Sequence, residues 1–228
     1  MRTSISPNRR HLGLFRRREF LVPTMRGWIL ILLISVSLVL LTIREAYPFL
    51  AVTSPVSGGD LVVEGWVSDD AFDKAILEFK RNPYRKLYVT GGPIEQGASL
   101  LGYTTYAEFG AAVLRSKGLS PDSVQAVPAP HVDRDRTYAS AMALKDWQRE
   151  HGVTPGSYHI MSVGPHARRT RLLFEEALGE GVVVGITAIE DPSYDSKRWW
   201  KSSAGVRTVL GEAIAYVYAR LLFRPLGY

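Results

Sequence analysis

The stretch YHIMSVGPHARRTRLLF, residues 158–174, decides the fold of this chain. Residues 158–163 have the apolar pattern of a buried strand, and residues 167–178 have the spacing of an amphipathic helix. Gly164 and Pro165 join them, and proline is favoured at the first position of a helix. A strand that turns directly into a helix is the unit from which parallel α/β sheets are built.

The start of this helix has the features of an anion site. A helix N-terminus presents unpaired backbone N–H groups and the positive end of the helix dipole, which suit phosphate or carboxylate. His166, Arg168 and Arg169 lie in its first turn. We expect the arginines to contact an anion, with His166 as hydrogen-bond donor or general base whose charged form the dipole disfavours. The alternative is that the arginines only solvate the helix, or that Arg169 pairs with Glu175, Glu176 or a loop carboxylate.

Strand and helix patterns alternate along the rest of the chain. The sequence predicts strands at residues 60–63, 86–90, 123–127, 158–163 and 182–189, and helices at 71–80, 103–117, 138–150 and 167–178. A further apolar stripe predicts a packed helix at 206–222, whose end could lie near a bilayer surface. The predicted fold is therefore α/β, a three-layer Rossmann-like domain with a mostly parallel sheet of about five strands.

Polar and glycine residues cluster after the predicted strands, whereas the opposite loops show ordinary turn chemistry. Ligands of open parallel sheets bind beyond the carboxyl ends of the strands, so we expect a cleft at this edge. The candidate catalytic residues are Glu64 and His166. The candidate ligand-binding residues are Gly65, Gly91, Gly92, Arg136, Thr137, Ser162, Gly164, Arg168 and Arg169.

Each candidate also has a structural interpretation. Glu64 ends a buried strand, where an acid is costly unless it is paired or used, so it is a base or a partner of Arg169. Gly91 and Gly92 would let phosphate approach the backbone, or they only form a turn. Arg136 would be a second anion contact.

Other chemistries have less support. His131, Asp133 and Asp135 alternate in one loop, but the interleaved arginines favour a charged loop, and we predict no metal site. The chain has no cysteine, which excludes disulfides and thiolate chemistry. Neither a nucleophile elbow nor a Walker loop is present in the sequence, so serine hydrolysis and P-loop chemistry lose support.

Residues 27–43, GWILILLISVSLVLLTI, carry no charge and are bracketed by Arg26 and Arg44. As a helix they would span about 26 Å, close to the ~30 Å hydrocarbon layer. A cleaved signal peptide is the alternative, but its apolar region is only about 7–15 residues long, and small residues should follow it. Arg44 and Glu45 follow here, so we predict a transmembrane anchor that contacts the lipid bilayer.

Charge sets the expected orientation. Residues 1–26 hold seven arginines and one acid, Glu19, so their net charge of +6 equals that of the whole chain. The remaining residues are neutral overall, which argues against a nucleic-acid partner. We expect a cytoplasmic tail at 1–26, an anchor at 27–43, a linker at 44–59 and a periplasmic or extracytoplasmic domain at 60–228 of a single-pass inner-membrane protein.

The chain from about residue 60 to 222 resembles the ElyC/SanA/YdcF family of bacterial envelope proteins. The likeness rests on the strand end VVEG at 62–65, the VTGG turn at 89–92, the segment around Thr137 and the SVGPHARR segment at 162–169. Arg136, Ala139 and Ser140 stand where the family usually has Asp, Glu and Asn, so this is a divergent member. The positions that agree with the family pattern are Gly65, Gly91, Gly92, Thr137, Ala141, His166 and Arg169.

The resemblance implies a Rossmann-like fold behind one N-terminal span and a role in cell-envelope biogenesis, in peptidoglycan or lipid-carrier metabolism. One soluble relative is implied to bind S-adenosylmethionine. The expected ligand is a phosphorylated small molecule, lipid-linked or nucleotide-like, and the sequence names no cofactor. The alternative is a noncatalytic assembly factor that docks envelope proteins, which the altered Thr137 segment favours.

Overall fold

The computed structural model of the chain describes residues 22–95, 102–154 and 156–225. The Arg-rich tail up to residue 21 lies outside this part, and so does the predicted orientation signal that it carries. The chain divides into two compact units, residues 1–41 and 42–228.

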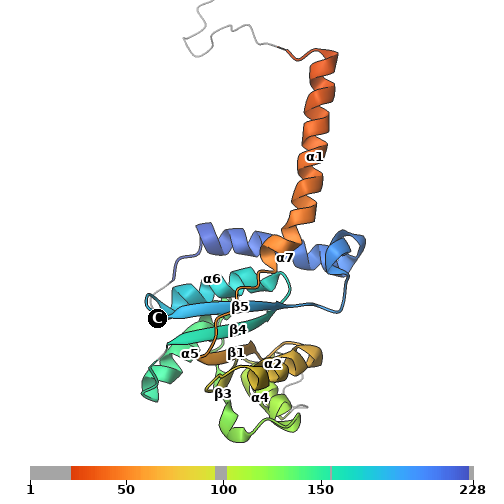
Figure 1. Cartoon of the computed structure of the whole chain (residues 1–228). Helices are drawn as coiled ribbons and strands as arrows, with labels where there is room; N and C mark the ends of the chain where they lie inside the picture. Colours follow the sequence, from red (N-terminus) through yellow and green to blue (C-terminus); the bar gives the residue numbers. More distant parts are fainter. Residues whose placement is uncertain (1–21, 96–101, 155, 226–228) are drawn as a thin grey trace, which may run out of the picture. The chain divides into compact units, whose positions relative to one another are not determined.

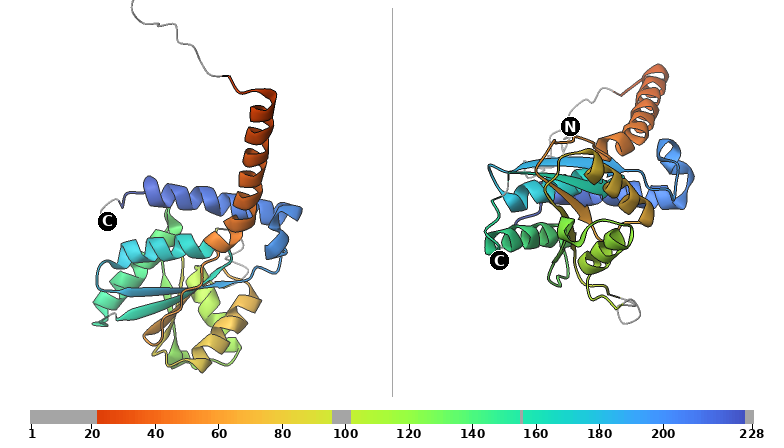
Figure 2. Two further views of the ribbon diagram at one scale, coloured as in Figure 1. Left: turned by 45° about the horizontal axis from the view of Figure 1, so that its top comes forward. Right: turned by 60° about the horizontal axis from the view of Figure 1, so that its bottom comes forward.

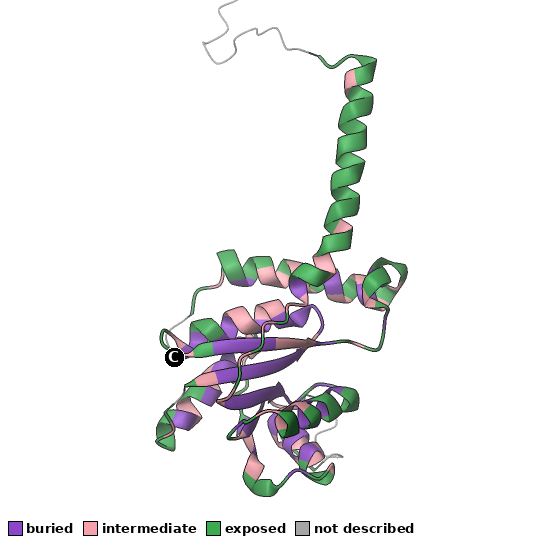
Figure 3. Cartoon of the chain, viewed as in Figure 1, coloured by how far each residue is buried: buried purple, intermediate pink, exposed green. Residues whose placement is uncertain are grey.

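Helix α1, Met25–Leu50, is the one helix of the described residues that is long and apolar enough to cross a membrane. Its apolar side chains are exposed along the predicted anchor, as the green ribbon of Figure 3 shows. Exposure of this kind is typical of a helix whose surroundings are lipid rather than water.

The second unit is built on a five-stranded, all-parallel sheet with the strand order β3-β2-β1-β4-β5 (Figure 1). The predicted α/β fold is confirmed, and the strand order, which the sequence left open, is that of a doubly wound sheet. The strands are β1 (Asp60–Glu64), β2 (Leu87–Gly91), β3 (Val124–Pro128), β4 (Ser157–Val163) and β5 (Val183–Ile189).

Helices cover both faces of this sheet (Figure 2). Alternate residues of β1 point to opposite faces of the sheet. Leu61 and Val63 contribute to the core on the first face, and Val62 contributes to the core on the second. The first face carries α2 (Asp69–Arg81) and α4 (Tyr106–Ser116), and the second carries α5 (Arg136–Glu150) and α6 (His166–Leu178). Helix α7 (Ser203–Leu221) packs against α6, and two short 3-10 helices are η1 (Pro121–Ser123) and η2 (Ser196–Lys201).

Residues 44–59, the expected linker, belong to the second unit. Helix α1 continues through them to Leu50, which is buried with Trp199 and Val209. Beyond the helix, Ser54 forms an antiparallel bridge with Ile186 at the edge of the sheet. The apolar character of this segment explains the packing, because exposed Leu50 would cost about 1.5–3 kcal/mol.

The order in which successive strands are added to the sheet reverses at β1. Strands β2 and β3 add on one side of β1, and β4 and β5 add on the other. Beyond the carboxyl ends of β1 and β4 the connections therefore diverge to opposite sides and leave a crevice. The Glu64 end of β1 lies at this crevice.

Candidate functional site

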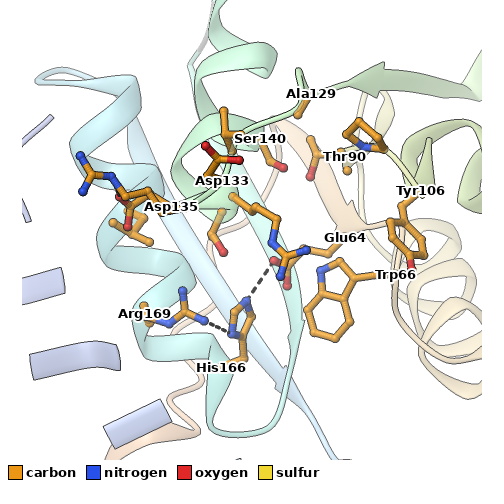
Figure 4. A pocket seen from close by; sticks show the side chains of 18 of the residues that line it. Glu64, Trp66, Thr90, Tyr106, Ala129, Asp133, Asp135, Ser140, His166 and Arg169 are labelled. Carbon is orange, nitrogen blue, oxygen red and sulfur yellow. Dashed lines mark hydrogen bonds and ion pairs between the residues drawn. The ribbon is translucent and has the colours of Figure 1, made fainter. Parts of the chain in front are cut away.

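A cavity of about 600 Å³ lies at the carboxyl edge of the sheet (Figure 4). Its wall includes Glu64 from the end of β1, Thr90–Gly92 from β2 and Ala129 after β3. The first residues of α4, α5 and α6 line it as well, and α7 closes one side with Glu212. The expected cleft is therefore present at the expected edge.

Glu64 is only 4% exposed and lies at the base of the cavity. Ser162 of β4 donates a 2.6 Å hydrogen bond to its Oε2, and His166 Nε2 lies 3.2 Å from its Oε1. Burial of a carboxylate is costly without such partners. Glu64 is therefore paired with His166, and not directly with Arg169 as one sequence interpretation had it.

His166 lies between two carboxylates. Its Nε2 faces Glu64, and its Nδ1 is 2.9 Å from Oε1 of Glu212. Burial lowers the pKa of His166, but the charge of Glu64 and the hydrogen bonds to both carboxylates outweigh it and raise the pKa to about 9. The helix dipole, which was expected to disfavour the charged form of His166, is here opposed by two adjacent carboxylates that favour it.

Arg169 holds the second carboxylate. Its Nε and Nη2 donate to the two oxygens of Glu212 at 2.8 and 3.0 Å, a bidentate pair. Burial raises the pKa of Glu212, and hydrogen bonds from His166 and Arg169 reverse this and lower it to about 2. The partners that the sequence suggested are not used, since Glu175 pairs with Arg171.

Arg169 Nη2 also lies 2.9 Å from Nδ1 of His166 (Figure 4). Guanidinium is always a donor, so this contact is a hydrogen bond only if Nδ1 carries no proton. The raised pKa makes both imidazole nitrogens donors. In that form Nδ1–H and Arg169 both donate to Oε1 of Glu212, and Arg169 acts on His166 through this carboxylate.

Three helix N-termini reach the cavity, and only one is capped by side chains. Thr105 and Glu108 form a capping box at α4. No side-chain cap is present at α5, whose N-cap residue Asp135 has a left-handed backbone conformation, or at α6, whose N-cap residue is Pro165. The uncapped N-termini of α5 and α6 therefore present backbone donors toward one cavity.

Thr90 adds an unused donor to the wall. Its side chain is 1% exposed, and its Oγ1 has no hydrogen-bond partner among the described residues. A buried hydroxyl without a partner costs about 1–3 kcal/mol. Such a group at a cavity wall is typical of a site that a polar ligand completes.

The predicted glycines have two different roles. A Cβ on Gly65 would lie 2.1 Å from the carbonyl oxygen of Tyr106, so Gly65 is needed for packing against α4 and does not line the cavity. A Cβ on Gly91 would also meet Tyr106, at 2.8 Å. At Gly92 the nearest atom would be 3.9 Å away, and this residue exposes backbone to the cavity.

The rim of the cavity is charged. Arg136 is exposed and pairs with Glu95 at 2.7 Å, and Thr137 lies beside it in the first turn of α5. His131, Asp133 and Asp135 lie along the same wall, but no group of three metal-binding side chains forms among the described residues.

Three further candidates lie away from the cavity lining. Ser162 is buried beneath Glu64, and Gly164 turns the chain with φ 46° against Tyr194. Arg168 points to the other side of α6, where it donates to the carbonyl oxygen of Phe49 and lies 4.0 Å from the centre of its ring.

Sequence reasoning missed Glu212, the residue that links His166 to Arg169. It is the only acid in α7, a helix apolar on nearly all sides, and that isolation was a usable signal. Trp66 was also missed as a site residue, although it packs edge-on against His166 with ring centres 5.3 Å apart.

Comparisons with family models, curated proteins and solved structures found no match for this chain.

Proposed function

We propose that this chain is a membrane-anchored, extracytoplasmic α/β domain that binds a phosphorylated ligand in the cavity at the carboxyl edge of its sheet. The observation that carries the proposal is the meeting of two uncapped helix N-termini, those of α5 and α6, beside His166 in one cavity, and the raised pKa of His166 supports it. Backbone donors and an imidazolium together favour phosphate.

The charges of the network support an anionic group at the N-termini rather than on Arg169. Glu64 contacts His166, and Glu212 contacts Arg169, so each cation of the network already faces a carboxylate. Arg169 is committed to Glu212 through two of its nitrogens. The phosphate would instead meet the N–H groups of α5 and α6, the backbone at Gly92 and, at the rim, Arg136.

His166 is suited to hold or donate a proton at Nε2. Its Nε2 contact with Glu64, at 3.2 Å, is longer than the Nδ1 contact with Glu212, at 2.9 Å, so a ligand oxygen would compete for Nε2–H first. Glu212 and Arg169 would keep the ring in place during that exchange. A general acid at this position would protonate a phosphate ester or leaving oxygen.

Membrane anchoring through α1 and the resemblance to the ElyC/SanA/YdcF family support a role in cell-envelope biogenesis. The ligand would be a diphosphate group carried on a lipid or on a nucleoside. Both sources share the chemistry of the phosphate and differ in the group that fills the rest of the cavity.

The test is calorimetric titration of the full chain, in maltoside micelles that contain no phosphate, with pyrophosphate, farnesyl diphosphate and adenosine diphosphate at pH 7. We expect binding of pyrophosphate and tighter binding of whichever conjugate resembles the natural ligand. His166→Gln should lower the affinity about tenfold or more, the loss of roughly 1.4 kcal/mol.

The matched control is Arg85→Gln. Arg85 is paired with Asp60, which lies in β1 like Glu64, but this pair is outside the cavity. Its affinity for pyrophosphate should equal that of the unaltered chain. Absence of binding by all three compounds, or equal losses in both variants, would contradict the proposal and favour the docking alternative.

A further inference from the structure

Helix α7 has an exposed apolar stripe that the fold does not cover. Leu210, Ile214, Val217 and Leu221 are 50%, 72%, 53% and 73% exposed. At about 100° per residue they fall within roughly 60° of one another, so they form one continuous row. Contiguous apolar surface of this kind marks an interaction site rather than ordinary surface.

The opposite side of α7 faces the cavity. Glu212, Ala215 and Ala219 line the cavity. They lie about half a turn of the helix away from the stripe. Because the cavity accounts for one side of α7 and the stripe for the other, the stripe needs a partner of its own.

The end of the anchor packs beside the same helix. Trp199 Nε1 donates a 3.1 Å hydrogen bond to the carbonyl oxygen of Ile43, the last residue of the apolar run. Ile43 and Leu50 belong to a cluster with Val209 and Tyr216. From Ile43 to Leu50 a helix rises only about 10 Å, comparable with a headgroup layer of roughly 5–8 Å.

Basic side chains flank the stripe. Arg207, Arg220 and Arg224 are exposed along or just beyond α7, and its only acid, Glu212, faces the cavity. An apolar row bordered by arginines is the pattern of a helix that lies in the surface of a bilayer with anionic lipids. A soluble protein partner would not require this coincidence with the anchor.

We propose that α7 lies on the membrane surface, with Leu210, Ile214, Val217 and Leu221 inserted among the lipids. This proposal rests on the part of the proposed function that anchors α1 in a bilayer, and it is independent of the ligand in the cavity. The occupant of the stripe is lipid. A consequence is that one side of the cavity wall is a helix whose other side contacts the bilayer.

Because the chain has no cysteine, single cysteines can carry a fluorescent probe without background labelling. The full chain is reconstituted in vesicles of phosphatidylethanolamine and phosphatidylglycerol that contain lipids with shallow or deep nitroxide quenchers. Probes are placed at Ile214→Cys and Val217→Cys. Leu77→Cys on α2 is the matched control, since Leu77 is also apolar and 49% exposed but lies on the other face of the sheet. Ser37→Cys reports insertion of the anchor.

We expect the probes at 214 and 217 to lose about half of their fluorescence to the shallow quencher and less to the deep one, as for a surface helix. The probe at 77 should lose almost none. The added change Ile214→Asp should reduce the quenching at 217, while thermal unfolding checks that the domain stays folded.

Two results would overturn the proposal. If the probe at 37 is quenched and those at 214 and 217 behave like that at 77, the anchor is inserted and the surface role of α7 is wrong. If 214 and 217 are shielded from water without quenching, a protein partner covers the stripe. Failure of the probe at 37 would refute the anchor as well, whereas pyrophosphate binding would be unaffected.

Discussion

The two ends of strand β1 each bury a carboxylate, and the protein treats them differently. At the amino end, Asp60 is bound by Arg85 through two hydrogen bonds, and the arginine remains half exposed. At the carboxyl end, Glu64 begins a chain of paired side chains that runs through His166 and Glu212 to Arg169. Glu64 lines the cavity of about 600 Å³, and neither Asp60 nor Arg85 is part of that lining.

The difference distinguishes a structural ion pair from a candidate site. One flexible arginine is sufficient to pair a buried acid, as Asp60 demonstrates. The carboxyl end instead uses residues from three elements, leaves the hydroxyl of Thr90 unpaired and leaves two helix N-termini uncapped. Unpaired buried groups and uncapped helix N-termini lower stability, and proteins retain them mainly where a bound ligand supplies the missing hydrogen bonds.

The largest expected effect is common to both ends and concerns packing alone. A Cβ at Gly59 would lie 2.2 Å from the carbonyl oxygen of Ser157, and one at Gly65 would lie 2.1 Å from that of Tyr106. Gly59→Ala and Gly65→Ala should each destabilise the chain by about 3 kcal/mol or more, measured by denaturant unfolding in micelles. Gly92→Ala is the control and should change stability by less than about 1 kcal/mol. A stable Gly65→Ala chain would show that α4 does not seal this end.

The second effect is a dependence of stability on pH that only the carboxyl end should produce. The pKa of His166 rises from 6.5 to about 9 on folding, so its stabilisation is complete below pH 6.5 and is lost as the pH rises through 9. The loss should be on the order of 3 kcal/mol. His166→Gln should flatten the free energy of unfolding over this range, and an unchanged slope would refute the charged network.

The third comparison removes one acid from each end. Glu212→Gln should cost about 2–3 kcal/mol at pH 7, because His166 and Arg169 stabilise the ionised form that persists down to about pH 2. Asp60→Asn should change stability by no more than about 1 kcal/mol, because burial raises the pKa of Asp60 and Arg85 offsets this only in part. Equal losses in denaturant unfolding would remove the distinction between the ends.

The smallest effect concerns the unused hydroxyl. Thr90→Val should raise the free energy of unfolding by about 1 kcal/mol while weakening pyrophosphate binding, because the buried Oγ1 is unpaired until a ligand enters. Thr187→Val is the matched control, since its Oγ1 is bonded to His159 at 2.9 Å, and it should lower stability by a similar amount. Loss of stability in both variants would show that Thr90 already has a partner.

The fold was largely predictable because its signals are local. Apolar runs gave the five strands, and the helices began and ended within a few residues of the predicted limits. Gly118, for example, follows α4 with φ 95°, as expected of a residue beyond a helix C-terminus. The start of α4 was predicted at residue 103 and lies at Tyr106, because the Thr105 capping box fixes it there.

The site was predictable only in part, because its charge network is non-local. Glu64, His166 and Arg169 were found from one strand end and one helix start. Glu212 is 46 residues beyond His166, and only the packing of α7 on α6 brings the two together. Arg168 and Arg169 are adjacent in sequence, but Arg168 packs over the ring of Phe49 on the opposite side of α6.

The most direct test of the account is the protonation of His166 itself. The imidazole resonances of the full chain in micelles are followed from pH 5 to 10 with and without pyrophosphate, and His166→Gln identifies the signal among the five histidines. The account predicts a pKa of about 9 without pyrophosphate and a higher pKa with it. A titration near 6.5 that pyrophosphate does not move would contradict it.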